Sequence, residues 1–310
     1  MITRTIAMWW LCVLVAAGLG YADEVAHGEA VVLQNETLTV EIMVDDASMR
    51  EHRGPRFDET ARVRSVQRDG REYLHPFGLC DEFGLEGLGA LGFDEADVGE
   101  AFIKVGVGLL ERHDPRRYAF NRGYPLVEPF AVDTVEASAD TVTVTQASPE
   151  LRGYAYQLTK RYRIEGAKLY IAYALTNVGD RPFAFEQYNH NWFQFDEQPI
   201  GRHTYIEPAF TLPPLPFTWL VPEGEAWRFD RPIVPGDNRY WAVSGEIPRE
   251  KAGVTVGDRQ TGQRVHVSGD FAMSRFALYA DADSVCPERF VRFDVEPDET
   301  VRWTRAYTFE

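Results

Sequence analysis

Apolar and polar side chains alternate along much of this chain, and this two-residue period narrows the folds that are open to it. The alternation is plain in residues 38–44 (LTVEIMV) and 141–146 (TVTVTQ). Successive side chains of a strand face opposite sides of a sheet, so this period is typical of strands buried on one face. The 3.6-residue period of an amphipathic helix is hard to find after the first segment of the chain. The sequence therefore predicts an all-β protein.

Two long hairpins are predicted from the same pattern. The first joins residues 154–164 to residues 169–179 through the turn EGAK, and the alternate apolar residues of its second arm share one face. The second closes the sequence, with residues 289–295, the turn EPDE and residues 301–309. Antiparallel neighbours joined by short turns are expected in both places.

Two stretches do not show a strand pattern. Residues 74–102 are rich in glycine and acidic residues, and residues 208–227 contain five prolines. We predict a long ordered loop for each, and loops of this length in a compact domain are usually functional. No internal repeat and no shift in composition marks a linker. One large antiparallel β-sandwich is the economical interpretation, and two fused β-domains are the alternative.

The start of the chain is a segment of a different kind. A basic residue is followed by an apolar run from Ile6 to Leu19 and by small residues up to Ala22. This is the layout of a secretory signal peptide, residues 1–22. We therefore expect a mature domain of residues 23–310 that is periplasmic or secreted, with no membrane association after cleavage. An uncleaved N-terminal anchor is the alternative.

The balance of charges excludes some partners. The chain has 32 Lys and Arg against 48 Asp and Glu, a net charge of −16. Charge alone will not draw such a chain to nucleic acid or to an anionic membrane. Two cysteines remain beyond the signal peptide, Cys80 and Cys286, and the sequence fits one disulfide as well as two thiols.

Several common catalytic motifs are absent from the sequence. The glycine-rich stretch GLEGLGALG (84–92) lacks the Lys-Ser/Thr pair of a phosphate-binding loop, and there is no G-x-S-x-G motif. His190 and His203 are not at metal-ligand spacing. No metal and no cofactor is expected. Acid–base chemistry by carboxylate and imidazole groups is left as the main catalytic option.

The segment EQYNHNWFQFD (186–196) places a histidine between two asparagines and among aromatic rings. In a strand, Asn189 and Asn191 lie on the face opposite His190, and Trp192 shares the face of the histidine. An indole beside an imidazole suits a sugar, because rings stack on its C–H surface while polar tips bind its hydroxyls. A buried aromatic strand with a hydrogen-bonded histidine is the alternative.

Residues 187–196 resemble the Asn-His and aromatic segment of the aldose 1-epimerase (galactose mutarotase) superfamily, in which the histidine is the general acid. The end of the chain, residues 285–309, is similar to the end of the same family, where a glutamate precedes a turn and a last strand. The resemblance therefore implies that His190 is the catalytic acid and Glu288 the catalytic base. The two segments are separated as they are in the family.

Other segments in the same order are similar to an extracytoplasmic branch of this superfamily, namely 54–66, 78–84, 92–110 and 153–164. The resemblance covers most of the mature chain. It implies a galactose-mutarotase-like antiparallel β-supersandwich with a sugar cleft. It also implies interconversion of sugar anomers, in which a carboxylate and an imidazolium on opposite sides of the anomeric centre open and reclose the ring without a cofactor. The expected partner is a monosaccharide or an oligosaccharide.

The chain departs from the family in its substrate-binding segments. The family's His-Gly-Gly segment is missing, and an acidic stretch with Asp81 and Glu82 stands in its place, followed by Lys104. Arg56, in the short match PRF, is a candidate for the family's arginine. The predicted substrate-binding residues are thus Arg56, Asp81, Glu82, Lys104, Asn189 and Trp192.

Two alternatives belong to other classes. A non-catalytic carbohydrate-binding module on the same fold would keep the cleft without turnover. A polysaccharide lyase is the third, although such enzymes usually add a helical domain for which this chain is too short. The sequence does not indicate the sugar or the oligomeric state.

Overall fold

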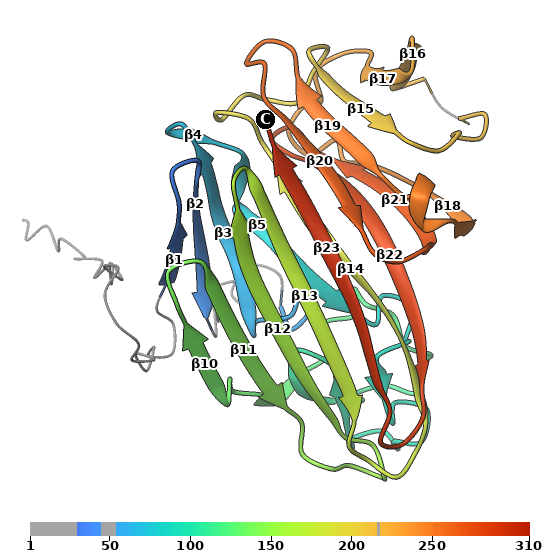
Figure 1. Cartoon of the computed structure of the whole chain (residues 1–310). Helices are drawn as coiled ribbons and strands as arrows, with labels where there is room; N and C mark the ends of the chain where they lie inside the picture. The colour runs from blue at the N-terminus through green and yellow to red at the C-terminus, as the bar shows by residue number, and fades with distance from the viewer. Residues whose placement is uncertain (1–29, 45–53, 216–217) are drawn as a thin grey trace, which may run out of the picture.

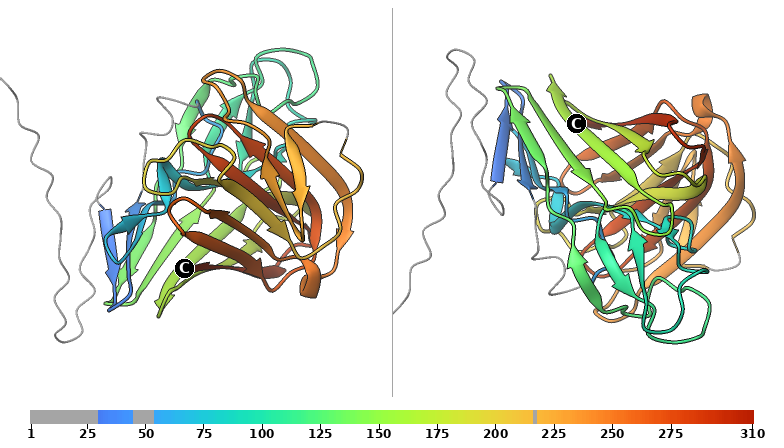
Figure 2. Two further views of the ribbon diagram at one scale, coloured as in Figure 1. Left: turned by 90° about the horizontal axis from the view of Figure 1, so that it is seen from above. Right: turned by 90° about the horizontal axis from the view of Figure 1, so that it is seen from below.

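The structure is a computed structural model, and it describes residues 30–44, 54–215 and 218–310. The predicted signal peptide and the first residues of the predicted mature domain lie outside the described residues. Two large antiparallel sheets face each other, and a small third sheet lies at one end (Figures 1 and 2). The described residues include no helix that is long and apolar enough to cross a membrane.

The first large sheet has nine strands. In spatial order these are β1 (Ala30–Gln34), β2 (Leu38–Val44), β3 (Ala61–Arg68), β5 (Leu74–Phe83), β14 (Phe183–Phe193), β22 (Val285–Val295), β21 (Met273–Ala280) and β18 (Arg239–Ile247), with β4 (Arg71–Glu72) paired to β3.

The second large sheet has ten strands. In spatial order these are β10 (Thr134–Ala137), β11 (Thr141–Ala147), β12 (Tyr156–Glu165), β13 (Lys168–Asn177), β23 (Thr300–Phe309), β20 (Arg264–Gly269), β19 (Val254–Asp258), β15 (Thr204–Pro208), β17 (Ala226–Phe229) and β16 (Leu220–Glu223). The small sheet consists of β6 (Ala90–Leu91), β7 (Ala101–Lys104), β8 (Gly108–Glu111) and β9 (Leu126–Pro129), and a 3₁₀ turn spans Arg249–Lys251.

The first predicted hairpin is confirmed, and the second is wrong. Strands β12 and β13 pair without interruption from Tyr156 opposite Asn177 to Glu165 opposite Lys168. Strands β22 and β23 form the two arms of the second predicted hairpin, but they belong to different sheets. The turn between them therefore carries the chain from one sheet to the other, and β23 pairs with β13 instead.

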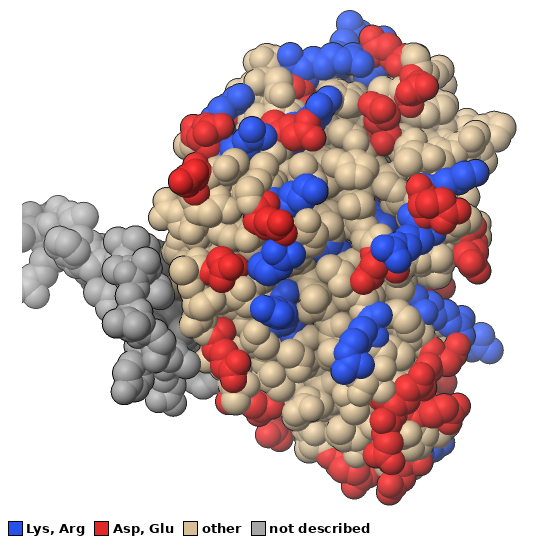
Figure 3. Space-filling view, in the orientation of Figure 1, with Lys and Arg blue, Asp and Glu red and all other residues tan. Residues whose placement is uncertain are grey.

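The core lies between the two large sheets because each presents one apolar face to the other. Along β13 every second residue is buried, from Leu169 to Leu175, as the alternation predicts. One apolar cluster includes these residues together with Val40 and Phe185 of the nine-stranded sheet. Figure 3 shows basic and acidic side chains interspersed on the outer side of the ten-stranded sheet, so that face is a mixed-charge solvent surface.

The predicted loop over 74–102 is wrong in its first part, and its remainder contains β6 and the start of β7. Leu74–Phe83 forms β5, which pairs with β14 in the middle of the nine-stranded sheet. Every residue from Gly78 onward is buried, so this part of the strand has no solvent face and shows no alternation of apolar and polar residues. Gly78 itself has φ of 70°, and a Cβ there would lie 1.9 Å from the carbonyl oxygen of Val63. Only glycine fits at this close approach between strands.

The second predicted loop, 208–227, is interrupted by β16 and by the start of β17. Its described part before Leu220 contains no strand beyond Pro208. This stretch therefore remains a surface connection between β15 and β16, as its prolines indicate.

Candidate functional site

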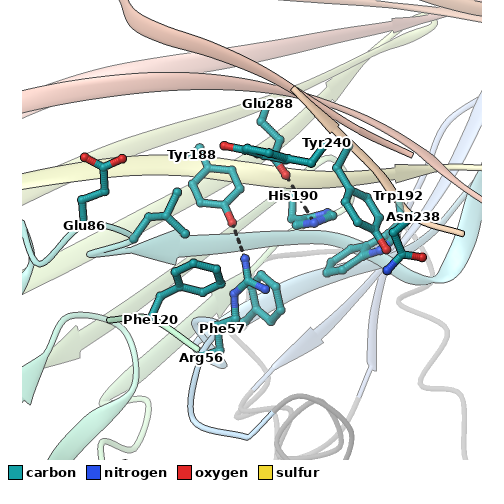
Figure 4. A pocket seen from close by; sticks show the side chains of 12 residues that line it. Arg56, Phe57, Glu86, Phe120, Tyr188, His190, Trp192, Asn238, Tyr240 and Glu288 are labelled. Carbon is teal, nitrogen blue, oxygen red and sulfur yellow. Dashed lines mark hydrogen bonds and ion pairs between the residues drawn. The ribbon is translucent and has the colours of Figure 1, made fainter. Parts of the chain in front are cut away.

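A cavity of about 500 Å³ opens on the nine-stranded sheet, on the face turned away from the ten-stranded sheet (Figure 4). This volume lies in the range of small-molecule sites. Most of its wall is aromatic. The lining residues are Arg56, Phe57, Leu85, Glu86, Phe120, Tyr188, His190, Trp192, Asn238, Tyr240, Tyr279 and Glu288.

Strand β14 supplies the floor of this cavity through its alternation. Tyr188, His190 and Trp192 face the cavity, and the imidazole stacks on the indole with ring centroids 3.9 Å apart. The residues between them face the other sheet, where Asn189 donates to the Tyr173 hydroxyl at 3.2 Å and Asn191 accepts from Tyr307 at 3.0 Å. The predicted division of faces is therefore confirmed.

His190 and Glu288 come together across two neighbouring strands. Gln187 pairs with Val291 and Phe193 with Val285, a register that sets His190 directly opposite Glu288. The His190 Nε2 lies 3.3 Å from the Glu288 Oε1, and their side chains are only 6% and 3% exposed. The two side chains thus meet at the bottom of the cavity (Figure 4).

This geometry corrects one expectation. The two groups were expected on opposite sides of the anomeric centre, with a sugar ring between them. They instead lie side by side on one wall, because β14 and β22 are adjacent strands and the two residues are cross-strand neighbours. A substrate therefore has to approach both from the same side.

Burial governs the charge of Glu288. Desolvation raises its pKa from 4.5 to about 8; Arg56 lowers it, Glu82 raises it and Arg275 lowers it, each by less than burial raises it. Near neutral pH burial therefore favours a carboxyl that holds a proton, and His190 at 3.3 Å is close enough to share it. Together with the imidazole the carboxyl forms a pair in which one group can donate a proton while the other accepts one.

Arg56 enters the cavity from the segment before β3 and is held on several sides. Its Nε donates to Glu82 at 2.9 Å and its Nη2 donates to the Tyr188 hydroxyl at 3.0 Å. The guanidinium lies 4.7 Å from the ring centre of Phe57 and 4.4 Å from that of Phe120. Burial would lower the pKa of Arg56, but Tyr188 and Glu82 outweigh it and raise the pKa, so the group stays charged.

Glu82 and Lys104 lie behind Arg56 and do not line the cavity. The Glu82 side chain is fully buried and also accepts from the Tyr188 hydroxyl. The Lys104 Nζ lies 3.7 Å from Glu82 and donates to the Tyr118 hydroxyl at 3.0 Å. The sequence assigned both residues to the substrate. In the structure Glu82 instead accepts from Arg56, and Lys104 lies beside Glu82. Both residues therefore help to hold the Arg56 side chain in place.

Asp81 and Asn189 were also predicted to bind the substrate, but neither lines the cavity. Both face the ten-stranded sheet, where Asn189 donates to Asp81 at 2.7 Å. Asp81 and Asp58 each lie 2.7 Å from the Nζ of Lys160, which is completely buried. Successive residues of a strand face opposite sides of the sheet. Glu82 faces the side of the cavity, and Asp81 therefore faces the interior. This correction removes both residues from the wall of the cavity.

No disulfide joins Cys80 to Cys286. Both thiols lie beneath the cavity, in an apolar cluster with Phe57 and Trp192. Cys80 is on β5 and Cys286 on β22, and β14 runs between these strands. Two strand spacings amount to roughly 10 Å, which is more than a disulfide spans. The sequence left both possibilities open, and the sheet order decides between them.

Several wall residues were not predicted. Tyr188 could have been found, because it lies two residues before His190 and alternation puts it on the same face. Tyr240, Tyr279 and Phe120 come from distant segments that no local pattern links to the histidine. In the described part of the chain, no group of three or more His, Cys, Asp or Glu side chains is arranged to hold a metal ion.

The fold and the cavity together define an antiparallel β-supersandwich with a pocket on one sheet. The protein has the galactose-mutarotase-like fold. It is similar to a galactose mutarotase related enzyme from Lactobacillus acidophilus, with a TM-score of 0.57 and 13% identity over 91% of this chain and 97% of that chain. It is also similar to a putative aldose 1-epimerase from Escherichia coli K12, with a TM-score of 0.53 and 12% identity over 91% of this chain and 98% of that chain.

A galactose mutarotase-like protein from Lactobacillus casei aligns equally well, with a TM-score of 0.57 and 13% identity over 91% of this chain and all of that chain. No protein-family model matches the sequence, and no curated protein matches it. The predicted fold is thus confirmed by structural similarity.

Proposed function

We propose that this protein interconverts the anomers of a reducing sugar by acid–base ring opening, with His190 and Glu288 as the catalytic residues. One observation carries the proposal. A carboxyl whose pKa is raised to about 8 touches an imidazole at 3.3 Å on the floor of an aromatic cavity. Perturbed carboxyl groups in a cleft are typical of catalytic acids and bases.

The contact between the two groups suits the chemistry of a hemiacetal. The anomeric hydroxyl and the ring oxygen are bonded to the same carbon, so an acceptor and a donor that lie side by side can reach both oxygens. With the shared proton on His190, Glu288 removes the proton of the anomeric hydroxyl and His190 protonates the ring oxygen. The C1–O bond of the ring breaks and an open-chain aldehyde forms.

Rotation about the C1–C2 bond then presents the other face of the aldehyde. The sugar hydroxyl attacks C1 and gives its proton back to His190, while Glu288 returns a proton to the aldehyde oxygen, which becomes the new anomeric hydroxyl. The pair ends with the single proton that it had at the start, so no cofactor enters the cycle. Each partner of such an acid–base pair typically contributes about 10²–10⁴-fold to the rate.

The other wall residues supply recognition. Tyr240 and Tyr279 offer rings for the C–H surface of a pyranose and hydroxyls for its oxygens. Asn238 and the guanidinium of Arg56 are further donors. Trp192 is 2% exposed and stacks under His190, so it supports the imidazole more than it contacts a ligand.

The test is the rate of anomer interconversion, measured by NMR or polarimetry on a panel of free hexoses, pentoses and uronic acids. Wild type, Glu288→Gln and His190→Asn are compared. Acceleration of at least one sugar by wild type, lost in both variants, is the expected result. Saturable binding without acceleration of any sugar would instead support a non-catalytic carbohydrate-binding module.

The site of action is part of the same proposal. The basic, apolar and small residues of the first 22 positions support export, with function in the periplasm or outside the cell. Expression of the full chain, followed by N-terminal sequencing of the protein from each cell fraction, tests this. A mature protein that begins at Asp23 is expected.

A further inference from the structure

A second cavity of about 300 Å³ lies directly beside the first. Its lining residues are Pro55, Arg56, Tyr118, Phe120, Asn121, Gly123 and Tyr124. Arg56 and Phe120 line both cavities, so the guanidinium and the ring stacked on it form the partition between them. In Figure 4 this partition lies on the side of the first cavity opposite Asn238 and Tyr240.

The walls of the second cavity are built by residues that are held in place. Tyr118 and Tyr124 stack with ring centroids 5.2 Å apart and planes 9° apart. The Tyr118 hydroxyl accepts from Lys104, and the Tyr124 hydroxyl accepts from the backbone N–H of Ala119, each at 3.0 Å. Both rings are thereby fixed by partners outside the cavity, and a ligand would meet a preorganised surface.

Most of the residues that line the second cavity belong to the loop between β8 and β9, residues 112–125. This loop is also held in place at its start. The Arg112 guanidinium donates to the carbonyl oxygens of Phe93 at 3.0 Å and Ala96 at 2.8 Å. Its positive charge lies over the Phe93 ring at 4.7 Å. These contacts tie the start of the loop that carries the second cavity to the segment between β6 and β7.

We propose that the second cavity binds the adjoining ring of an oligosaccharide whose reducing-end ring occupies the first. Rings of Phe120 and Tyr118 present apolar surface to the C–H face of a pyranose, and the Asn121 amide offers a donor and an acceptor for hydroxyls. Neighbouring cavities that share one wall match two rings joined by one glycosidic oxygen. This inference rests on the proposed function, because the free anomeric centre has to lie over His190 and Glu288.

The charges favour a neutral glycan over an acidic one. Arg56 is the single Lys or Arg among the residues that line either cavity, and Glu82 already neutralises it at 2.9 Å. Glu86 and Glu288 add acidic groups on the side of the first cavity. A uronic acid would bring a carboxylate to a site without an uncompensated positive charge. No ion pair would then offset the free energy needed to remove water from that carboxylate.

The experiment compares kcat/KM for anomer interconversion between neutral reducing disaccharides, with α- and β-linkages, and their component monosaccharides. Wild type is expected to prefer at least one disaccharide by about tenfold, which corresponds to ~1.4 kcal/mol of added contact. Asn121→Trp places a bulky ring in the second cavity, and the ratio of disaccharide to monosaccharide should fall to about one. Arg117→Trp, an exposed position on the same loop outside both cavities, is the matched control and should keep the preference.

The outcomes separate this inference from the function on which it rests. Equal kcat/KM for disaccharides and monosaccharides in wild type, unchanged in Asn121→Trp, would overturn the second subsite and leave the epimerase proposal standing. Saturable binding of a disaccharide that is weakened in Asn121→Trp but not in Arg117→Trp, without turnover of any sugar, would overturn the epimerase proposal and support the subsite.

Discussion

Replacing Glu288 by glutamine is expected to remove the proposed activity and, at the same time, to make the folded protein more stable. The carboxyl is almost fully buried, and its pKa is raised from 4.5 to about 8 mainly by desolvation. The ionised carboxylate is therefore less favourable in the folded state than in the unfolded chain. Glutamine keeps the shape and a hydrogen-bonding group but cannot ionise.

The size of the effect follows from the two pKa values. Below the ordinary pKa of 4.5 the carboxyl is protonated in both states, so the variant and wild type should be equally stable. Above it the unfolded chain loses the proton first, and wild type loses ~1.4 kcal/mol for each pH unit until the folded-state pKa is reached. The advantage of the variant should thus grow to ~3 kcal/mol near pH 7 and to ~5 kcal/mol above pH 8.

Chemical denaturation of both proteins at a series of pH values from 4.5 to 9 measures this difference. Glu86→Gln is the matched control, because Glu86 lines the same cavity but its side chain is 68% exposed. Its free energy of unfolding should follow that of wild type at every pH within about 0.5 kcal/mol. Parallel curves for wild type and Glu288→Gln would refute the reasoning, since they would mean that burial does not disfavour the carboxylate.

Three further results are expected. The double variant His190→Asn with Glu288→Gln should lose about as much kcat as either single variant, because the two groups act as a unit; losses that multiply would show that they act separately. The profile of kcat/KM against pH should fall above about 8, where the pair loses its one proton, and a continued rise there would contradict the shared-proton mechanism. Lys160→Met should destabilise the fold by about 3–5 kcal/mol, because Asp58 and Asp81 at 2.7 Å are left as buried unpaired charges. Adding Asp58→Asn and Asp81→Asn to that variant should recover part of the loss on chemical denaturation, and no recovery would exclude charge as the cause.

Much of the fold could be predicted because alternation is a local property. The pattern from Leu169 to Leu175 marks one buried face whatever the strand's neighbours are, and the predicted hairpin β12–β13 has that face in the core. The same rule placed His190 and Trp192 on one side of β14 and Asn189 on the other. It failed at β5, where burial on both faces removes the alternation.

The site could be predicted less well, since its residues come from strands that are distant in the sequence. Resemblance singled out His190 and Glu288, but the register of β14 against β22 makes them contact at 3.3 Å on one wall. From the sequence alone, the neighbouring acids Asp81 and Glu82 could not be assigned different roles. Their positions in β5 send one to Lys160 in the interior and the other to Arg56 at the cavity.

The physical reason is the range over which each force acts. Side-chain period and turn residues depend on neighbours along the chain, so strands and faces can be recognised before any partner is known. The order of strands in a sheet depends on backbone hydrogen bonds between segments about a hundred residues apart, as for β14 and β22. That order keeps Cys80 and Cys286 on either side of β14, sets an imidazole against a carboxyl, and turns separate aromatic residues into the walls of two adjoining cavities.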